Sequence, residues 1–282
     1  MTQFAARLAL AVAFIAPAVA GAQAAPAATA YNVLTVYRET VKPGKGTAHD
    51  AHEVAWAGAV AAANPPNAML AMTAMSGAPE SWYMSVYPSW AAYEKANKAS
   101  DASAALSAVQ KQYSAVEGDY LSDARGMVLT FRDDLSFMGP PQMATSRYMS
   151  VTRISVRPGH AAEFEENRKL IKAAHESAKV TDYYSVWQAA SGAPAGTYFL
   201  MVARKSLAEL DENAAIHGSA AYLAALGGED GQKKMTANSA AAIVSSQTDI
   251  FAFAPQQSYP PAEWISADPA FWKRKPAAKK TP

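Results

Sequence analysis

The chain has 282 residues, of which 50% are hydrophobic and 17% are charged, and its formal net charge is +1. This composition can bury a substantial core, which argues against global disorder, and the near-neutral charge argues against an electrostatic nucleic-acid binder. Cysteine is absent, so disulfides, thiolate metal sites and a cysteine nucleophile are excluded.

The N-terminal segment has the parts of a secretory signal peptide. Arg7 supplies a positive charge, residues 8–16 form an apolar run too short to span a bilayer, and small residues follow at Ala22 and Ala24. We expect residues 1–24 to be removed and the product to be periplasmic or secreted. A buried apolar helix is the alternative interpretation. No second run is apolar enough for a membrane helix, so we expect no transmembrane segment.

The segment after the signal peptide has the pattern of an α+β unit. Alternating β-forming residues indicate a strand over 32–41, and helix-forming residues indicate a helix over 47–63. The further elements expected are two strands joined by a Ser-Gly-Ala-Pro turn, two helices and a closing strand, at 68–75, 82–87, 89–98, 101–117 and 127–132. The order β-α-β-β-α-β predicts a four-stranded antiparallel sheet with helices on one face.

A second stretch of the chain repeats this pattern. Residues 31–79 and 146–194 align without a gap, so every matched pair keeps one constant separation. The matched residues are Val36 with Val151, Arg38 with Arg153, Val41 with Val156, Pro43-Gly44 with Pro158-Gly159, and Ser76 to Pro79 with Ser191 to Pro194. The period exceeds that of solenoid repeats, so we interpret the copies as domain-sized units over 31–134 and 145–253, with a linker at 135–144.

A sheet covered by helices on one face leaves its other face bare, and an apolar sheet face must pack against something. Two tandem copies can meet this need within one chain. We therefore expect the two sheets to lie face to face, with the space between them as the natural place for a ligand pocket.

The two strand-to-helix stretches, Val41–Lys45 and Val156–His160, resemble the dimeric α+β barrel superfamily, as does the block 208–226, which looks like that family's helix pair with a histidine at the joint. The resemblance covers residues 31–253 and is closest to antibiotic-biosynthesis-monooxygenase-like and NIPSNAP-like members. It implies an α+β fold of two tandem ferredoxin-like βαββαβ units, with antiparallel sheets packed face to face as an intramolecular dimeric α+β barrel. The superfamily contains cofactor-independent oxygenases, haem proteins and non-enzymatic members, so this fold does not choose a function.

Three histidines are the candidate catalytic residues: His49, His175 and His217. His49 lies on one side of the first helix with His52 and Trp56, a spacing that fits a ligand or general base beside an aromatic wall. The second copy has Phe164, Asn167 and Ile171 at the matched positions, which favours a packing role instead.

His175 extends the apolar stripe of the second long helix, so a core or boundary position is the alternative to a functional one. His217 lies at the joint of two helical segments, and in the resembled haem-degrading members a histidine on this helix binds the iron. The first copy has Ser100 there, and a surface histidine near a helix cap is the alternative. Because His49 and His52 are not repeated, a duplicated metal site is excluded. We assign no metal site, although one with ligands from both copies stays open.

Arg38 and Arg153 are matched charged residues within the two first strands, where their guanidinium groups could hold a carboxylate or phenolate between the sheets. The alternative is an arginine at the sheet rim that pairs with a carboxylate. The predicted strands are also rich in aromatic residues, which would favour a flat apolar or aromatic ligand. Those assigned to ligand binding, with the two arginines, are Tyr37, Tyr83, Tyr148, Trp187 and Tyr198.

The C-terminal segment, 254–282, is proline-rich and ends in basic residues. We expect it to pack Trp264, Phe271 and Trp272 on the body of the protein, with a solvated basic end. Contact of that end with a membrane surface or an acidic partner is the alternative.

The sequence lacks a nucleophile elbow, a phosphate-binding glycine loop, a zinc-protease helix motif and a dinucleotide fingerprint. The first hypothesis is therefore a non-catalytic, exported protein that binds a small aromatic molecule and needs no cofactor. The second is a cofactor-independent monooxygenase or isomerase, in which an arginine holds an oxyanion and a histidine acts as base. The third is a haem protein that uses His217. A homo-oligomer is compatible with all three.

Overall fold

The computed structural model describes residues 32–139 and 143–274. The predicted signal peptide, residues 1–24, lies outside the described residues, as do the last eight residues of the basic tail, 275–282. Among the described helices, none is both long enough and apolar enough to cross a membrane.

The two halves of the chain have closely similar element orders. The first half comprises β1 (Val33–Val41), α1 (Gly46–Ala62), β2 (Leu70–Ala74), β3 (Glu80–Tyr87), α2 (Trp90–Asp101), α3 (Ala104–Glu117) and β4 (Leu121–Phe131). The second half comprises β5 (Tyr148–Val156), α4 (Ala161–Ala178), β6 (Ser185–Ser191), β7 (Thr197–Arg204), α5 (Glu209–His217), α6 (Ala220–Ala225), α7 (Gly228–Ala242) and β8 (Ile243–Phe253). The order expected from the sequence is therefore present in both halves.

Backbone details also correspond between the halves. The pairing of β1 with β4 shifts register between Thr40 and Val41, and the pairing of β5 with β8 shifts between Ser155 and Val156. In the two Ser-Gly-Ala-Pro turns, Gly77 and Gly192 have φ angles of +80° and +77°, a region that favours glycine. Strand β4 begins earlier than the predicted 127–132. The sequence did not indicate this part of the strand because residues 122–126 are all exposed and carry no apolar alternation.

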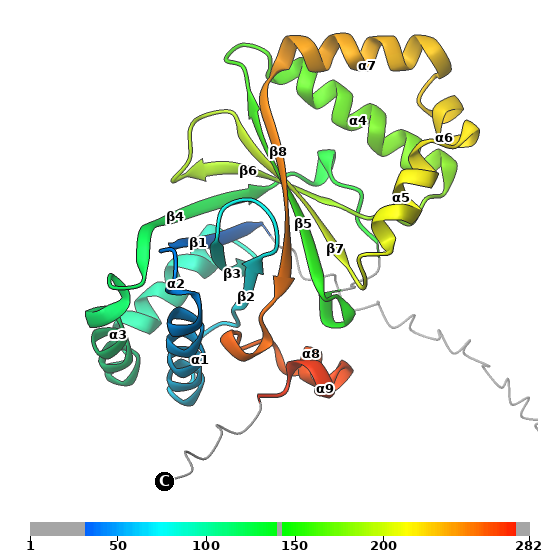
Figure 1. Cartoon of the computed structure of the whole chain (residues 1–282). Coiled ribbons are helices and arrows are strands. Elements are labelled where there is room, and N and C mark those ends of the chain that lie inside the picture. The colour runs from blue at the N-terminus through cyan, green and yellow to red at the C-terminus, as the bar shows by residue number, and fades with distance from the viewer. Residues whose placement is uncertain (1–31, 140–142, 275–282) are drawn as a thin grey trace, which may run out of the picture.

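The eight strands of the described residues form one closed antiparallel barrel, in the order β1-β3-β2-β8-β5-β7-β6-β4. The halves join at both sheet edges, through β2 with β8 and β4 with β6. Figure 1 shows α1 and α3 outside the first half of the barrel and α4 and α7 outside the second. The predicted fold, an intramolecular dimeric α+β barrel of two antiparallel sheets, is confirmed.

The inside of the barrel is a packed apolar core. Side chains that alternate along all eight strands point inward and are buried, among them Val36, Trp82, Leu129, Phe199 and Phe251. Trp82 contacts Phe251 and Phe199, with ring centroids 5.0 and 6.1 Å apart. The expectation of a ligand pocket between the sheets is therefore wrong for this central region, because large side chains fill it.

The C-terminal segment closes one end of the barrel. After β8 the chain forms a short turn, Pro255–Gln257, and two short helices, α8 (Ala262–Ala267) and α9 (Pro269–Trp272). Trp272 is fully buried against the barrel core, and its indole N–H donates to the Ala144 carbonyl at 2.6 Å. The packing of these aromatic residues is as predicted. The basic Arg274, however, is not simply solvated, since its guanidinium donates to the carbonyls of Val54 and Gln256.

The segment between the halves packs on the second half. Leu135 is fully buried, Phe137 forms a β-bridge with Tyr184, and the Ser136 hydroxyl accepts from the Val186 amide at 2.8 Å. This described part of the predicted linker is thus part of the barrel's outer layer.

Candidate functional site

A group of buried ionisable side chains lies between the first half of the barrel and helix α1. The His49 Nε2 atom is 2.7 Å from Glu39 Oε2 and 4.0 Å from Glu53 Oε1. All three residues are less than 5% exposed. Charged groups at this depth are costly unless they are paired, and here the imidazole lies between two carboxyl groups.

Two periodicities of the chain bring these residues together. Along β1, Val36 points into the barrel, so Tyr37 and Glu39 point outward toward the helices. On α1, His49 and Glu53 are one turn apart and share the face that covers the sheet. The strand therefore presents one carboxylate directly under a helix that presents an imidazole and a second carboxyl group.

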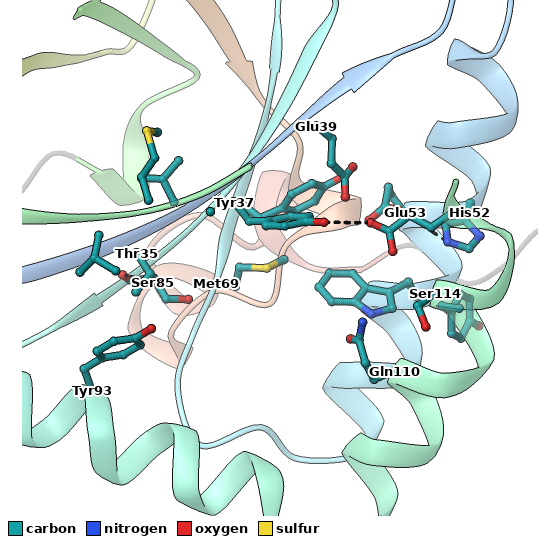
Figure 2. Close-up of a pocket in the computed structure, with 18 residues that line it drawn as sticks. Thr35, Tyr37, Glu39, His52, Glu53, Met69, Ser85, Tyr93, Gln110 and Ser114 are labelled. Carbon is teal, nitrogen blue, oxygen red and sulfur yellow. Dashed lines mark hydrogen bonds and ion pairs between the residues drawn. The ribbon is translucent and has the colours of Figure 1, made fainter. Parts of the chain in front are cut away.

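A cavity of about 470 Å³ adjoins this group, between the outer face of the sheet and helices α1 and α3. Its polar wall includes Glu39, Glu53, Glu117 and His52, and its aromatic wall includes Tyr37, Trp56, Tyr83, Tyr93 and Tyr113. Figure 2 shows Glu39 and Glu53 directed toward the same space as Tyr37. The volume and the mixture of apolar walls with a few polar groups are typical of small-molecule sites.

The surroundings raise the pKa values of His49 and Glu53 and so favour their protonated forms. Burial by itself lowers the pKa of His49, but the hydrogen bond and negative charge of Glu39 outweigh it, so the net pKa is raised. Burial, followed by the charge of Glu39, raises the pKa of Glu53 to about 8. At neutral pH the site therefore holds a carboxyl group near its titration point, as a general acid or base requires.

Three further groups on the cavity wall are perturbed. Burial and a hydrogen bond with Glu39 raise the pKa of Glu117 to about 7. Burial and the nearby Glu117 raise the pKa of Tyr37 to about 12, and its hydroxyl lies 3.4 Å from Glu117 Oε1. The buried Tyr83 hydroxyl has no hydrogen-bond partner among the described residues, yet it lies close enough to Glu53 for each group to shift the other's pKa. Perturbed groups of this kind gather at functional sites.

The matched region of the second half has a different character. Ile154 stands where the first half has Glu39, and Phe164 stands where it has His49. Phe164 packs on Tyr198 with ring centroids 4.5 Å apart, inside an apolar cluster under α4. Arg168, matched to Glu53, stacks over the Tyr184 ring. The acid–base group is therefore a feature of the first half alone.

The two arginines assigned to ligand binding lie away from this cavity. Arg38 is held at the end of the barrel by Glu80, to which its Nε donates at 3.2 Å, and its guanidinium lies 5.1 Å from the Trp82 ring centre. This is the rim ion pair that stood as the alternative for Arg38. Arg153 is half-buried at the matched position of β5 and has no ion-pair partner among the described residues.

The five aromatic residues assigned to ligand binding separate into different places. Tyr37 and Tyr83 line the cavity. Trp187 lies in the barrel core, where it packs on Phe131, and Tyr198 lies in the apolar cluster under α4. Tyr148 is half-buried at the start of β5. The structure thus brings together only the first two with the His49 group.

The other two candidate histidines lie together in the second half. His175, on α4, and His217, at the end of α5, have ring centroids 5.3 Å apart, and His217 Nε2 is 3.7 Å from Asp182 Oδ2. His217, assigned to haem in the third hypothesis, therefore turns its Nε2 toward a carboxylate.

Sequence reasoning identified His49 but missed its partners, Glu39, Glu53 and Glu117. A signal for two of them was present in the sequence. Glu39 matches Ile154 on the strand face that the helices cover, and Glu53 lies one turn after His49 on the covered side of its helix. A carboxylate at a position that is apolar in the other copy predicts a buried, paired charge, which is a candidate functional residue.

Comparisons with known proteins identify the fold. No family model matches the chain, and no curated protein matches it. Among solved structures, it is similar to a monooxygenase-like protein from Fusobacterium nucleatum, at 14% identity and a TM-score of 0.51 over 79% of this chain and 93% of that one. It is also similar to an anthrone oxidase-like protein, at 11% identity and a TM-score of 0.51 over 79% and 92% of the two chains. A monooxygenase-like protein from Lactobacillus acidophilus matches at 7% identity and a TM-score of 0.50, over 79% and 94%. These likenesses concern the fold, and that fold is the dimeric α+β barrel.

Proposed function

We propose that the first-half cavity binds a small neutral aromatic molecule and exchanges a proton with it. The observation that carries this proposal is the buried Glu39–His49–Glu53 group, which opens onto a cavity of about 470 Å³ with an aromatic wall. A purely structural ion pair would not need an adjoining cavity, and a simple apolar pocket would not need buried carboxyl groups.

Each member of the group has a distinct role in this proposal. Glu39 and Glu53 line the cavity, whereas His49 lies behind them and fixes the Glu39 carboxylate with a 2.7 Å contact. His49 is thus a positioning residue. Glu53, with a pKa near 8, takes a proton from the ligand or returns one to it at neutral pH.

The class of chemistry that fits best is cofactor-independent oxidation. Structures described as monooxygenase-like and anthrone oxidase-like share the fold, which supports this class in a coarse sense. A base removes a proton from an acidic ring CH₂ of the substrate, and the resulting carbanion is oxidised by O₂. The CH₂ group becomes a ketone: one oxygen atom of O₂ stays on that carbon, and the other leaves as water with the two hydrogens. The oxidant is O₂ itself, so no external reductant is needed.

The charges of the cavity favour a neutral ligand over an anionic one. Three carboxyl groups, those of Glu39, Glu53 and Glu117, line its wall, and both arginines once considered for binding an anion lie outside it. An anionic aromatic ligand would be repelled at short range by those of the carboxyl groups that are ionised.

The test uses anthrone, a neutral tricyclic ketone with one acidic CH₂ group. The purified protein is expected to bind anthrone and to convert it to anthraquinone, with one O₂ consumed per product, as an oxygen electrode and absorbance both measure. Glu53→Gln should lower kcat by about 100-fold or more, the usual contribution of a general base. Glu229→Gln, on an exposed part of α7, is the matched control and should leave the rate unchanged.

The outcomes separate the hypotheses. Binding of anthrone without turnover would favour the non-catalytic binding protein. An anionic analogue, 2-naphthoate, should bind at least tenfold more weakly than neutral 2-naphthol. Failure of both neutral probes to bind, or turnover that survives Glu53→Gln, would overturn the proposal.

We also propose that the protein works outside the cytoplasm, on the strength of the signal-like residues 1–24. The test is the intact mass of protein recovered from the periplasm or medium of its host, which should begin at Ala25. An uncleaved chain found only in the cytoplasm would contradict export.

A further inference from the structure

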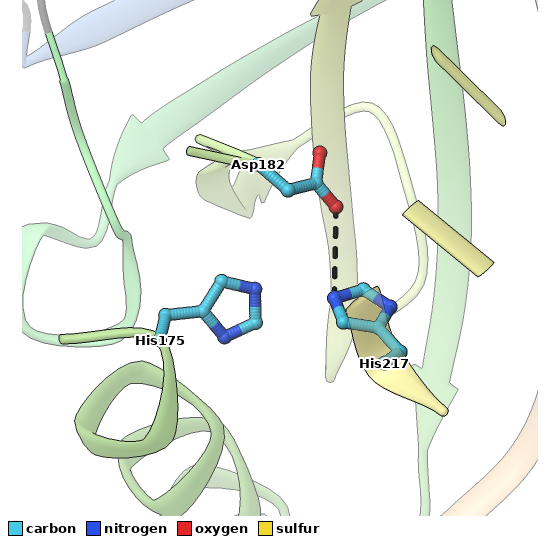
Figure 3. Close-up of side chains that lie close together, drawn as sticks. All are labelled: His175, Asp182 and His217. Carbon is cyan, nitrogen blue, oxygen red and sulfur yellow. Dashed lines mark ion pairs between the residues drawn. The ribbon is translucent and has the colours of Figure 1, made fainter. Parts of the chain in front are cut away.

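A second cluster of potential ligands lies in the other half, near the C-terminal end of α4. His175 comes from that helix, Asp182 from the loop that leads to β6, and His217 from the last residue of α5. One potential ligand atom from each residue lies within 4.8 Å of the other two. Figure 3 shows the three side chains converging on one small space from three separate segments.

The histidine nitrogens that face this space have no hydrogen-bond partner among the described residues. His175 Nε2 and His217 Nε2 are both buried without a hydrogen bond, and the His175 residue is only 1% exposed. An unpaired buried nitrogen is costly, and native structures rarely keep one without a reason such as an ion or a water. Here two such atoms occur side by side.

The opposite nitrogen of His175 is already held. His175 Nδ1 lies 2.8 Å from the carbonyl oxygen of Ile171 and 3.1 Å from the Tyr222 hydroxyl. Because a carbonyl can only accept, Nδ1 carries the hydrogen, and Nε2 keeps a free lone pair. A metal-binding histidine usually donates its other N–H to a backbone carbonyl or a carboxylate in this way.

Asp182 also has a partner on one side, through an ion pair. Its Oδ1 atom lies 3.7 Å from Nη1 of Arg204, which is buried, whereas its Oδ2 atom lies 3.7 Å from His217 Nε2. Two ligands about 2.1 Å from one tetrahedral ion are about 3.4 Å apart, so a small closure suffices. Arg204 therefore orients the carboxylate and leaves one oxygen available.

We propose that His175, Asp182 and His217 bind one divalent transition-metal ion, through the two Nε2 atoms and Asp182 Oδ2. Two imidazoles and one carboxylate suit ions such as Zn²⁺, Co²⁺ or Fe²⁺, and not Ca²⁺ or Mg²⁺, which prefer oxygen ligands. The His217 side chain is 41% exposed, so an ion has a path from solvent, and the three protein ligands leave at least one coordination position open.

The first-half group, Glu39, His49 and Glu53, also meets the distance criterion for a metal site, but its contacts differ. There His49 Nε2 already makes a 2.7 Å hydrogen bond with Glu39, so the nitrogen is satisfied without an ion. The nitrogens of the second cluster that lack a hydrogen bond favour that cluster as the metal site. This inference is independent of the proposed function of the cavity.

The experiment is a titration of the purified, EDTA-treated protein with Co²⁺, followed by its visible absorption and by calorimetry. One ion per chain is expected, with a rise in Tm, and Ca²⁺ should not compete. His217→Ala and Asp182→Asn should each weaken Co²⁺ binding at least about 10–100-fold, the loss seen even for residues that support metal ligands. His217 is exposed enough for its variant to keep the native circular dichroism spectrum.

Two control variants make the result specific. His160→Ala removes a half-exposed histidine elsewhere on the second half, and His49→Phe removes the first-half group by installing the residue found at the matched position. Both should bind Co²⁺ as the wild type does. No Co²⁺ binding by the wild type, equal binding by His217→Ala and the wild type, or loss of binding in His49→Phe would each overturn the proposal.

Discussion

The two halves of the barrel share strand order, register shifts and turn geometry, yet they fill the space between sheet and helix differently. In the second half, Ile154, Phe164 and Tyr198 form an apolar core under α4. In the first half, Glu39 and His49 stand at the positions of the first two and adjoin a cavity of about 470 Å³.

This difference indicates that the second half contributes more packing stability between sheet and helix than the first half does. Close apolar packing is the ordinary way to fix a helix on a sheet, and the second half uses it. The first half gives up that packing, buries carboxyl groups at a cost, and offsets part of the cost with the Glu39–His49 hydrogen bond. Such a local departure from good packing is expected where function requires it.

The largest effect should follow from a cavity in the apolar half. Phe164→Ala is expected to lower the free energy of unfolding by about 3–5 kcal/mol, because Phe164 is only 3% exposed and packs directly on Tyr198. Urea unfolding measures this value. A loss below about 1 kcal/mol would mean that the space between α4 and the sheet is not closely packed.

The second largest effect on stability should come from replacing the charged residues of the first half with the apolar residues found at the matched positions of the second half. His49→Phe leaves the buried Glu39 carboxylate without its hydrogen-bond partner and should cost about 2–3 kcal/mol. Glu39→Ile combined with His49→Phe should recover most of that loss in urea unfolding. If the double variant is no more stable than the single one, the apolar pair that packs under α4 cannot replace Glu39 and His49 under α1.

The pH dependence of stability should also distinguish the halves. Glu53 has a folded-state pKa near 8 against about 4.5 when unfolded, so the folded state holds more protons between these values. The contribution of Glu53 to the free energy of unfolding is therefore most favourable below about pH 4.5 and is lost as the pH rises toward about 8.

The measurement is urea unfolding of the wild type and of Glu53→Gln across this pH range. The variant should show a shallower decline and should exceed the wild type in stability at pH 8. Glu229→Gln, at an exposed position on α7, should follow the wild type at every pH. A variant curve that runs parallel to that of the wild type would contradict the raised pKa of Glu53.

The smallest effect concerns the matched arginines. Arg38→Gln should cost about 1 kcal/mol, because Arg38 is in a partly buried pair with Glu80, whereas Arg153→Gln should cost less than about 0.5 kcal/mol. Urea unfolding of both variants checks the difference. Equal losses would show that the Glu80 pair adds nothing to the first half.

The fold was accessible from the sequence because it depends on patterns that repeat. Strand alternation, the Pro-Gly breaks and the Ser-Gly-Ala-Pro turns occur twice, and a bare sheet face has few ways to be covered. The closing strands were only partly found, because the exposed residues 122–126 of β4 show no apolar alternation.

The site was less accessible, because its residues come from elements that meet only in the folded chain. His49 was identified, but the helix stripe suggested packing, and nothing local linked it to Glu39 on the strand. His175 and His217 were considered separately, and the loop residue Asp182 that joins them carries no motif. The arginines drew attention because they repeat, yet the acid–base group lies where the copies differ.

The central claim is that the first half holds a carboxyl group close to its titration point beside the cavity. The most direct measurement is the infrared C=O stretch of protonated carboxyl groups, followed from pH 5 to 9 in the wild type and in Glu53→Gln. We expect a wild-type band that disappears with a midpoint near pH 8 and is missing from the variant. If Glu53→Gln and the wild type lose the same bands, all below about pH 6, the first half holds only ordinary carboxylates and the claim is wrong.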